Sequence, residues 1–395
     1  MSAGLPQGFL FSSGIAGIKT SGRPDLALAL IPDGASAAAM FTRNLVVAAP
    51  LTVGREHLRV SRGRIHAVIV NSGNANCATG NQGLQAARQV CSNLAMMLGI
   101  KPAQVFPSST GIIGVPLPVE KIATALPAVA GAASDDQSGF EAFANAILTT
   151  DTKKKVACES IRHKNATVTM IGVAKGAGMI HPNMATMLVY LFTDVAANSR
   201  ELQPVLRSAV EASFNNMSID GDTSTNDTVL LLASGKSGVP MKAIGKQFAA
   251  ALHRICNSLA EQIVRDGEGV EHFVRLKIEQ ARTREDARKI ARAIANSPLV
   301  KTAWAGADPN WGRMLAAIGY SGVKVDPARI NIYLGSQAIC QNGGASLFDK
   351  NAAHEYMSQA EYEIRFELGA GRASLEFLSC DLTQEYVRFN AEYST

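Results

Sequence analysis

The sequence predicts a mixed α/β fold with a substantial share of antiparallel sheet. Helical and strand-like hydrophobic periods alternate along the chain, and the last third consists of short strand-like runs joined by turn residues. Hydrophobic residues make up 47% of the 395 residues and charged residues only 18%, so the chain can bury a large core. These observations favour layers of helices packed on sheets.

Helical periodicity of the apolar residues predicts helices at residues 84–98, 140–148, 202–214, 248–264 and 284–295. Runs rich in β-branched residues predict strands at residues 66–70, 167–173, 186–192, 229–233, 330–334, 362–368, 373–378 and 385–391. Glu367–Arg372 carries glycines at turn positions between two of these runs, so we expect a hairpin there. The sequence alone does not order the strands.

Composition excludes several classes of protein. The formal net charge of +5 is only mildly basic, and neither Lys153–Lys155 nor Arg282–Arg292 has the aromatic interleaving of a nucleic-acid site. The six cysteines lack CxxC pairs and the histidines lack metal spacing, so we expect reduced thiols and no metal. Neither a signal peptide nor a membrane-spanning run of about 18 apolar residues is visible. We therefore expect a cytoplasmic globular protein without membrane or nucleic-acid partners.

The most informative segment is Lys175-Gly-Ala-Gly-Met-Ile-His-Pro-Asn-Met-Ala-Thr-Met-Leu188. Its glycines and proline predict an irregular loop that leads into a strand, and Thr186 stands at the junction. If the Ala185–Thr186 bond were cut, Thr186 would carry a hydroxyl nucleophile. It would also carry an α-amine base whose ordinary pKa is about 7.7–8.0. Considered alone, the segment is also compatible with an ordinary loop before a core strand.

Nearly the whole chain resembles the ornithine acetyltransferases, also called glutamate N-acetyltransferases, of arginine biosynthesis. The resemblance rests on residues 175–188 and on further motifs that occur in the expected order. These motifs are Ala16–Asp25, Asn71–Asn76, Ser109–Pro116, Thr150–Thr152, Asp220–Asp227, Arg265–Gly269, Ala295–Thr302 and Asp308–Arg313. Many separated matches in the right order are far more specific than any one of them.

The resemblance implies a fold with αββα layers, built from two intertwined fragments that arise by self-cleavage between Ala185 and Thr186. The fragments are residues 1–185 and 186–395, and an (αβ)2 heterotetramer is implied. The implied reaction moves acetyl from N-acetylornithine to glutamate through acetylated Thr186, without a cofactor. Some members also accept acetyl-coenzyme A. No residue decides between the two forms, and we slightly favour the one restricted to N-acetylornithine.

The resemblance also assigns site residues. Thr110 and Gly111 are assigned to the oxyanion hole, because a Thr-Gly turn can present N–H groups to an anion. Lys175 would pair with the α-carboxylate of the substrate and Glu268 with the δ-ammonium of ornithine; considered alone, they would be a surface lysine and a turn residue. The residues assigned to substrate binding are Thr152, Lys175, Thr186, Glu268, Asn390 and Thr395.

Three further features have weaker assignments. His181 could assist cleavage, although a mechanism based on the α-amine needs no histidine. Asn71–Asn76 is expected to be a polar loop that supports the site, and Asp308–Arg313 to begin a helix that scaffolds the pocket. Ser394 stands where the family usually has a basic residue, which affects how the C-terminal tail covers the pocket.

Two other classes of function remain open. An N-terminal threonine that uses water as acceptor would make the protein an amidase or aminopeptidase, and activation by glutamate would distinguish this from a transferase. A non-catalytic relative could keep the fold and bind amino acids. Intact Thr186, Lys175 and Glu268 argue against the latter class.

Overall fold

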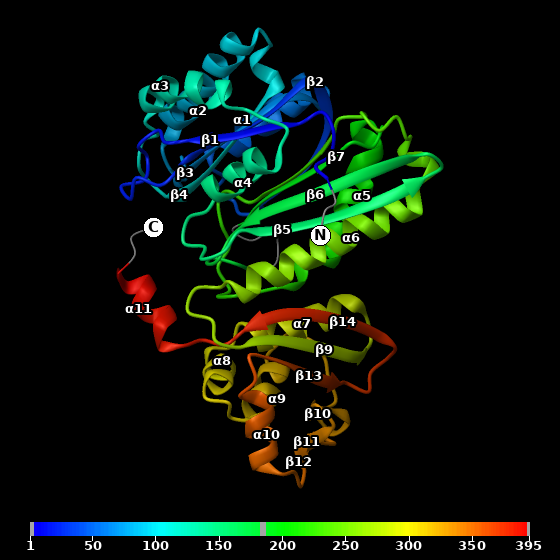
Figure 1. Ribbon diagram of the computed structural model, residues 1–395. Helices are drawn as coiled ribbons and strands as arrows, with labels where there is room; N and C mark the ends of the chain where they lie inside the picture. The colour runs from blue at the N-terminus through cyan, green and yellow to red at the C-terminus, as the bar shows by residue number, and fades with distance from the viewer. Residues whose placement is uncertain (1–3, 182–186, 393–395) are drawn as a thin grey trace.

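The computed structural model describes residues 4–181 and 187–392, which form two β-sheets with helices packed on them (Figure 1). The first sheet has the strand order β4-β3-β2-β8-β7-β6-β5, with β1 paired to β2. The second sheet has the order β12-β11-β10-β13-β9-β14. Both parallel and antiparallel pairings occur in each sheet, so the predicted mixed α/β class is confirmed.

The first sheet contains β1 (Leu10–Gly14), β2 (Leu26–Phe41), β3 (Arg64–Asn74), β4 (Val105–Ile112), β5 (Lys155–His163), β6 (Ala166–Lys175), β7 (Leu188–Thr193) and β8 (Thr228–Ala233). The long strand β2 joins the two halves of this sheet. Its first part pairs with β1 and β3, and after an irregularity between Leu30 and Ala35 its second part pairs with β8. Such an irregularity bends a strand and increases its twist.

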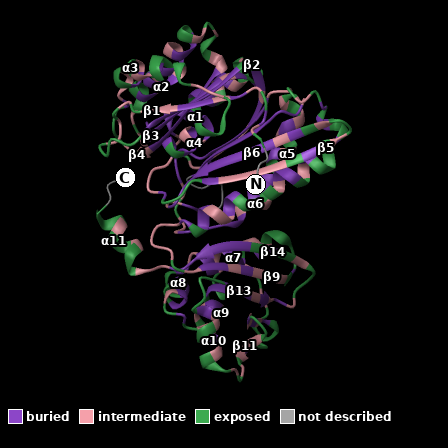
Figure 2. Ribbon diagram, in the orientation of Figure 1, coloured by how far each residue is buried: buried purple, intermediate pink, exposed green. Residues whose placement is uncertain are grey.

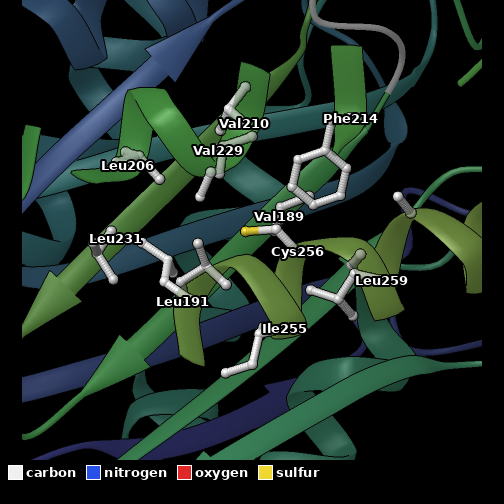
Figure 3. Packing of buried hydrophobic residues seen from close by; sticks show 14 of the residues in the cluster. Val189, Leu191, Leu206, Val210, Phe214, Val229, Leu231, Ile255, Cys256 and Leu259 are labelled. Carbon is white, nitrogen blue, oxygen red and sulfur yellow. The ribbon is translucent and has the colours of Figure 1, made fainter. Parts of the chain in front are cut away.

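Helices cover the first sheet: α1 (Ala49–Val60), α2 (Gly80–Leu98), α3 (Val119–Gly131), α4 (Gln137–Ala146), α5 (Ser199–Ala212) and α6 (Gly245–Arg265). One apolar cluster packs β2 and β3 against α2 and α3, and another packs β6, β7 and β8 against α5 and α6 (Figure 3). A third cluster takes side chains from both halves of the sheet, including Phe11, Val68 and Tyr190. The two halves therefore pack on each other. Helix α4 joins this shared cluster, whereas α2 and α3 cover the outer side of one half and α5 and α6 that of the other.

The second sheet contains β9 (Phe273–Ala281), β10 (Asn331–Leu334), β11 (Gln337–Gln341), β12 (Gly344–Ala345), β13 (Glu361–Glu367) and β14 (Ala373–Cys380). Its helices are α7 (Arg284–Ala295), α8 (Pro298–Ala305), α9 (Trp311–Gly319) and α10 (Lys350–Met357). One apolar cluster, centred on buried Trp304, joins the sheet to these helices. Ion pairs such as Arg275–Glu376 and Lys277–Glu363 cover the other face.

All five predicted helices are found, as α2, α4, α5, α6 and α7. Local capping supports two of them, because the Asn198 side chain accepts N–H groups at the start of α5 and Thr283 does so at the start of α7. Asp308–Arg313 begins α9, as expected. No described helix has the length and apolarity required to cross a membrane. Short 3-10 turns lie at Pro102–Gln104, Phe214–Asn216, Met241–Ala243 and Pro327–Arg329.

Two predictions of secondary structure in the last third of the chain are wrong. The hairpin expected at Glu367–Arg372 does not form, because β9 lies between β13 and β14 and pairs with both. The strand expected at residues 385–391 is helix α11 (Gln384–Glu392), which has no buried residue (Figure 2). No described strand pairs with this segment, so its backbone groups satisfy one another within a helix.

Candidate active site

Thr110 and Gly111 lie near the end of β4, which runs parallel to β3. Gly111 has a φ of +132°, and a Cβ atom at this position would lie 2.3 Å from the backbone carbonyl carbon of Gly73. Only glycine tolerates this conformation and this close approach. The predicted Thr-Gly turn is therefore an irregular strand end, where the register between β3 and β4 shifts beside Asn74.

Lys175 is the last residue of β6 and is buried, with 4% of its surface exposed. Its Nζ donates a hydrogen bond to Thr110 Oγ1 at 3.2 Å, so two predicted site residues meet. Burial lowers the pKa of Lys175, and the carboxylate of Asp151 acts most strongly in the opposite direction. Within residues 4–181 and 187–392, Lys175 forms no direct ion pair. Lys175 is thus a buried lysine rather than a surface one, and its Nζ can take an anionic group of a substrate.

A buried ion network supports the segment that follows Lys175. Lys155 Nζ lies 2.6 Å from Asp151 Oδ1 and 2.6 Å from Asp266 Oδ2, and all three side chains are nearly inaccessible. Asp151 Oδ1 also accepts the N–H of Gly176 at 2.6 Å. Burial acts to raise the pKa of Asp151, but Lys175 and Lys155 outweigh it and lower the pKa to about 2. Asp151 is therefore an anion at neutral pH.

Thr152 is attached to the same network. Its N–H donates to Asp266 Oδ2 at 3.1 Å, and its hydroxyl donates to Asp266 Oδ1. A pocket of about 240 Å³ is lined by Thr152 and Asp151 together with Lys19 and Arg23. Lys19 donates to the carbonyl groups of Pro24, Ala146 and Leu148, so it ties the pocket wall together.

Glu268 and Asn390 meet although 122 positions separate them: Asn390 Nδ2 donates to Glu268 Oε2 at 3.0 Å. Asn390 belongs to α11, which extends from the end of β14 toward the first sheet (Figure 1). Gly178 leaves room for the Glu268 carboxylate, since a Cβ atom there would lie 2.6 Å from Glu268 Oε2. In the described part of the chain no basic side chain pairs with Glu268, so its carboxylate can receive a substrate ammonium.

Asp220 holds the segment that leads into the expected cleavage point. Its carboxylate accepts the N–H of Met179 at 2.5 Å and the N–H of Ile180 at 2.9 Å. Burial raises the pKa of Asp220 to about 6. The Tyr386 hydroxyl of α11 donates to the same carboxylate at 3.4 Å. Helix α11 and the segment Met179–Ile180 are thus linked through one side chain.

His181 lies between Asn296 and Ser218, with its Nδ1 3.1 Å from Asn296 Nδ2 and 3.5 Å from Ser218 Oγ. Burial, together with the nearby positive charge of Arg292, lowers the pKa of His181 to about 4. The imidazole is therefore neutral at neutral pH. An assisting role in cleavage stays a prediction.

Ala185, Thr186 and Thr395 lie outside the described residues, as does Ser394. Met187 is the first described residue after Thr186, and its N–H donates to Asp227 Oδ1 at 2.9 Å. The roles expected of the nucleophile, of the cleaved bond and of the last residue stay predictions.

Polar side chains connect the end of β4, where Thr110 and Gly111 lie, to the loop before β8. Asn226 Nδ2 donates to the carbonyl oxygens of Ser109 and Ala75 at 2.8 and 2.7 Å. Ser109 Oγ donates to Asn71 Oδ1 at 2.6 Å, and Asn71 Nδ2 donates to the carbonyl of Asn74 at 2.8 Å. The predicted polar loop at Asn71–Asn76 is wrong in its first part, because residues 71–74 belong to strand β3. The expected support of this region agrees with these bonds.

Several residues of the site were not singled out from the sequence. They share a carboxylate, ammonium or amide group that is buried beside a predicted site residue: Asp151, Lys155, Asp220, Asn226, Asp227 and Asp266. Most of them lie inside the motifs on which the family resemblance rests. Membership in a motif was the only feature of the sequence that could have indicated them. Their partners are distant in sequence, so spacing could not identify the pairs.

One group in the described residues could hold a metal ion. Glu271, His272 and Asp381 each offer a ligand atom, and these atoms all lie within 4.8 Å of one another. The expectation of no metal rested on histidine spacing, which cannot detect ligands that are 110 positions apart. Glu271 is exposed, and the N–H of Glu271 already binds Asp381 Oδ1 at 3.1 Å.

Comparisons with known proteins agree with the motifs. A sequence model of the ArgJ family matches residues 10–395. The Arginine biosynthesis bifunctional protein ArgJ of Methylococcus capsulatus is 45% identical over 394 residues, which covers 98% of this chain and 95% of that protein. The protein of the same name from Thermus thermophilus is 46% identical over 398 residues and covers 100% of both chains.

Two solved structures are also similar to the chain. The Arginine biosynthesis bifunctional protein argJ from Bacillus halodurans is 37% identical with a TM-score of 0.50, covering 52% of this chain and 98% of that chain. The Ornithine Acetyltransferase complexed with Ornithine from Mycobacterium tuberculosis is 34% identical with a TM-score of 0.39, covering 45% of this chain and 92% of that chain.

Proposed function

The chain belongs to the ArgJ family, and on that premise we propose that it is an autoprocessed acyltransferase of arginine biosynthesis. It moves the acetyl group of N2-acetyl-L-ornithine to L-glutamate and releases L-ornithine and N-acetyl-L-glutamate. The observation that carries the proposal is the buried Lys175 ammonium bonded to Thr110, which brings the expected anion-binding cation onto the expected oxyanion segment.

Self-processing creates the nucleophile. The Thr186 hydroxyl attacks the carbonyl carbon of Ala185, and the amide C–N bond breaks as the acyl group shifts to oxygen. Water then hydrolyses the ester, which leaves a carboxylate on Ala185 and a free α-amine on Thr186. The match to the Bacillus halodurans structure covers 98% of that chain but only 52% of this one. The solved chain is therefore about half as long as this protein. That length agrees with one fragment of a protein cleaved at this point.

Turnover then proceeds in two acyl transfers. The α-amine of Thr186 takes the hydroxyl proton, the oxygen attacks the acetyl carbonyl, and ornithine leaves with the proton on its amine. Glutamate attacks the acetyl-threonine in the second step and regenerates the hydroxyl. N–H groups of the Thr110–Gly111 segment stabilise the oxyanion in both steps.

The charges of the site fit an amino-acid substrate. Lys175 is a buried cation without a direct anionic partner in the described part of the chain, and Glu268 is a carboxylate without a cationic one. A buried charge is costly until it is paired, so Lys175 is completed by an anionic group of the ligand, while the half-buried Glu268 carboxylate receives a cationic one. Lys175 takes the α-carboxylate and Glu268 the δ-ammonium of ornithine, with Thr152, Asn390 and Thr395 completing the pocket.

The larger organisation follows the same proposal. The first sheet and its helices, here called the first unit, are assigned to the αββα fold of the ornithine acetyltransferase type. In this fold two half-sheets pack on each other between two layers of helices. The units of chemistry are residues 1–185 and residues 186–395, which stay associated because β6 and β7 pair across the cleavage point. Two copies of each fragment make the (αβ)2 heterotetramer, and a cytoplasmic location stays a prediction.

For the donor range we now favour the bifunctional form, which also accepts acetyl-coenzyme A and acts as an amino-acid N-acetyltransferase. Two full-length relatives at 45% and 46% identity are named bifunctional proteins, and this outweighs the slight preference for the form restricted to N-acetylornithine. Formation of N-acetylglutamate from acetyl-coenzyme A without N-acetylornithine tests this assignment.

The primary test is the intact mass of the denatured protein with and without N-acetylornithine. We expect two fragments that meet at Ala185–Thr186, and one added acetyl group on the C-terminal fragment after exposure to the donor. Thr186→Ala is expected to stay uncut and unacetylated. An uncut, unacetylated native chain would refute the mechanism, and ornithine release that glutamate does not accelerate would indicate a hydrolase.

A further inference from the structure

Lys19 belongs to the segment Ala16–Asp25, on which part of the family resemblance rests and to which the proposed reaction gives no role. Buried Asp25 folds this segment back on itself, and its Oδ2 accepts the N–H of Lys19 at 3.0 Å. The stem of Lys19 lies against β3, since a Cβ atom at Gly73 would lie 3.0 Å from Lys19 Cγ. Gly73 is also the residue that approaches Gly111. Lys19 therefore lies beside the strand end to which the oxyanion hole is assigned.

The Lys19 ammonium binds only uncharged acceptors among the described residues. Its Nζ lies 2.9 Å from the carbonyl oxygen of Pro24 and 2.7 Å from that of Leu148. A third carbonyl oxygen, that of Ala146, lies at 3.4 Å and already accepts the Ser72 hydroxyl at 2.5 Å. This third bond is long and shares its acceptor, so its N–H can turn to a ligand at little cost. The carbonyl groups orient the cation but do not neutralise it.

Lys19 keeps most of its positive charge at neutral pH. Burial lowers its pKa to about 8, and Lys175 and Arg23 act in the same direction. The carboxylates of Asp25 and Asp151 act to raise this pKa. An ammonium that is partly desolvated and close to two other basic side chains is stabilised by the arrival of an anion.

Lys19 and Arg23 line the pocket of about 240 Å³ that also contains Asp151 and Thr152, to which substrate binding is assigned. Arg23 is exposed and forms no ion pair in the part of the chain that the structure describes. The Asp151 carboxylate is already compensated by Lys155 at 2.6 Å, so the pocket has an excess of positive charge. Pockets for drug-sized ligands measure about 300–1,000 Å³, so this pocket suits a small anionic group rather than a nucleotide.

The second acyl transfer requires a cationic partner that Glu268 cannot provide. Ornithine and glutamate share the α-amine and the α-carboxylate, but their side chains end in opposite charges. The Glu268 carboxylate attracts the δ-ammonium of ornithine and repels the γ-carboxylate of glutamate. Rotation about the Cα–Cβ bond moves a side chain to another staggered position without moving the α-groups. Glutamate can thus keep its α-carboxylate at Lys175 and direct its side chain away from Glu268.

We propose that Lys19 and Arg23 form a subsite for the side-chain carboxylate of the acceptor glutamate, so that one active site accepts two side chains of opposite charge. The inference rests on the proposed function. Arg23 offers the paired N–H groups that match a carboxylate, and Lys19 adds the N–H that points to Ala146 in the free enzyme.

The test compares acceptors in the full-length enzyme, with N-acetylornithine as donor. Glutamine has nearly the shape of glutamate without its side-chain charge, so the ratio of the two kcat/KM values measures recognition of that charge. Exchange of labelled ornithine into N-acetylornithine reports the same acetyl-enzyme with an acceptor that uses Glu268. Lys19→Met keeps most of the stem and removes the ammonium, and Arg23→Gln removes the guanidinium.

Lys121→Met is the matched control. Lys121 in α3 donates to the carbonyl of Gly17, in the same segment as Lys19, at 3.0 Å, but it does not line the pocket. We expect K121M to keep the wild-type ratio of glutamate to glutamine. Lys19→Arg is expected to retain most of the preference for glutamate, because it restores a cation at this position.

We expect the ratio of glutamate to glutamine to fall about 10-fold or more in K19M, because a partly buried, charge-assisted hydrogen bond is lost. In R23Q the ratio should fall about 3-fold, because Arg23 is exposed. Ornithine exchange should fall far less than transfer to glutamate in both variants, because ornithine has no side-chain carboxylate.

An unchanged ratio in both K19M and R23Q would overturn the inference and leave the acyl-enzyme mechanism intact. An equal loss of transfer to glutamate, glutamine and ornithine would also overturn it, because Lys19 would then only support the fold of its segment. A higher KM for acetyl-coenzyme A with an unchanged ratio would assign the pocket to a phosphate group instead.

If K19M does not fold, R23Q decides: a lowered ratio supports the inference, and an unchanged ratio refutes it. A wild-type enzyme that is never acetylated, or from which glutamate does not accelerate ornithine release, would refute the proposed function rather than the subsite alone.

Discussion

The two sheets of this protein bury their strands in different ways. Every residue of β7 and β8 is buried, and consecutive residues such as Leu191 and Phe192 belong to apolar clusters on opposite faces of the sheet. In β9 the side chains alternate: Leu276 lies in an apolar cluster, whereas Arg275 and Lys277 form ion pairs on the other face. The first sheet is packed on both faces. The second is packed on one face along most of β9, and among the described residues its other face joins an apolar cluster of the first sheet only at Phe273, Leu378 and Cys380.

The difference in packing explains why a site of fixed geometry can form at the first sheet. A strand packed on both faces cannot shift without breaking contacts in two clusters, so residues at its ends are held firmly. Thr110 and Lys175 stand at such ends, and Asp227 directly precedes β8. The second unit contributes α11, which has no buried residue and brings Asn390 to Glu268.

The largest expected effect is on the buried ion network of the first unit. Lys155→Met leaves the carboxylates of Asp151 and Asp266 buried without their shared cation, and we expect a loss of about 3–5 kcal/mol in the free energy of unfolding. Lys277→Met in the second sheet removes a partly exposed pair with Glu363 and is expected to cost less than about 1 kcal/mol. Urea unfolding of both variants measures the difference, and equal costs would contradict the comparison.

The same network predicts acid sensitivity. The folded pKa of Asp151 is about 2, below the ordinary value of about 3.9 in an unfolded chain. Its ionised form therefore stabilises the fold above about pH 4, and this contribution is lost as the pH falls toward 2. Lys155→Met raises the pKa of Asp151, so acid unfolding followed by circular dichroism should begin at higher pH than in the wild-type protein. An unchanged acid midpoint would show that Lys155 does not hold this carboxylate ionised.

Truncation of consecutive residues in β7 compares the two faces of the first sheet. We expect Leu191→Ala and Phe192→Ala each to lower the free energy of unfolding by about 3 kcal/mol, because each side chain fills a different apolar cluster. The measurement is again urea unfolding. A neutral result for either residue would mean that one face of β7 does not contribute to the core.

A change at Gly111 tests whether the strand end carries the chemistry. Gly111→Ala would place a methyl group 2.3 Å from the backbone of Gly73, and we expect kcat for acetyl transfer to fall about 100-fold while the fold persists. Gly114→Ala is the matched control, because Gly114 also has positive φ but has open space around its Cβ position. Similar kcat values for the two variants would argue against an oxyanion role for this segment.

The smallest expected effect is on the charged face of the second sheet. Arg275→Ala removes pairs with partly exposed carboxylates, including that with Glu376, and should cost less than about 1 kcal/mol. Leu276→Ala, one position along the same strand, should cost about 3 kcal/mol. A difference of this size between neighbours in β9, together with its absence between Leu191 and Phe192, would establish the contrast between the two sheets.

Local signals identified elements that carry one clear period. Helices such as α5 and α7 combine a single buried face with capping residues, and both were predicted. Strand β2 was missed because Pro32-Asp33-Gly34 interrupts its apolar run, as a turn would. Helix α3 contains Pro127, which weakens the helical signal in the same way. In both cases the packing of the whole sheet outweighs an unfavourable local residue.

The site was predicted unevenly for a related reason. Motifs named Thr110, Lys175 and Glu268, but they could not indicate that Lys175 is buried against Thr110 or that Asn390 reaches Glu268. These contacts join positions 65 and 122 residues apart. The carboxylate that accepts the Met187 N–H was missed for the same reason, because the link depends on the parallel pairing of β7 with β8.

Residue types and short hydrophobic periods were enough to predict the mixed α/β class, five of the helices, the family resemblance and the position of the threonine expected to act as nucleophile. These properties depend on residue type and on periods of a few residues, which are local. Three features became apparent only in the folded chain: β9 separates β13 from β14, residues 384–392 form a helix, and Lys175 is buried against Thr110. Strand order and burial depend on contacts between distant segments, and these contacts exist only once the chain has packed.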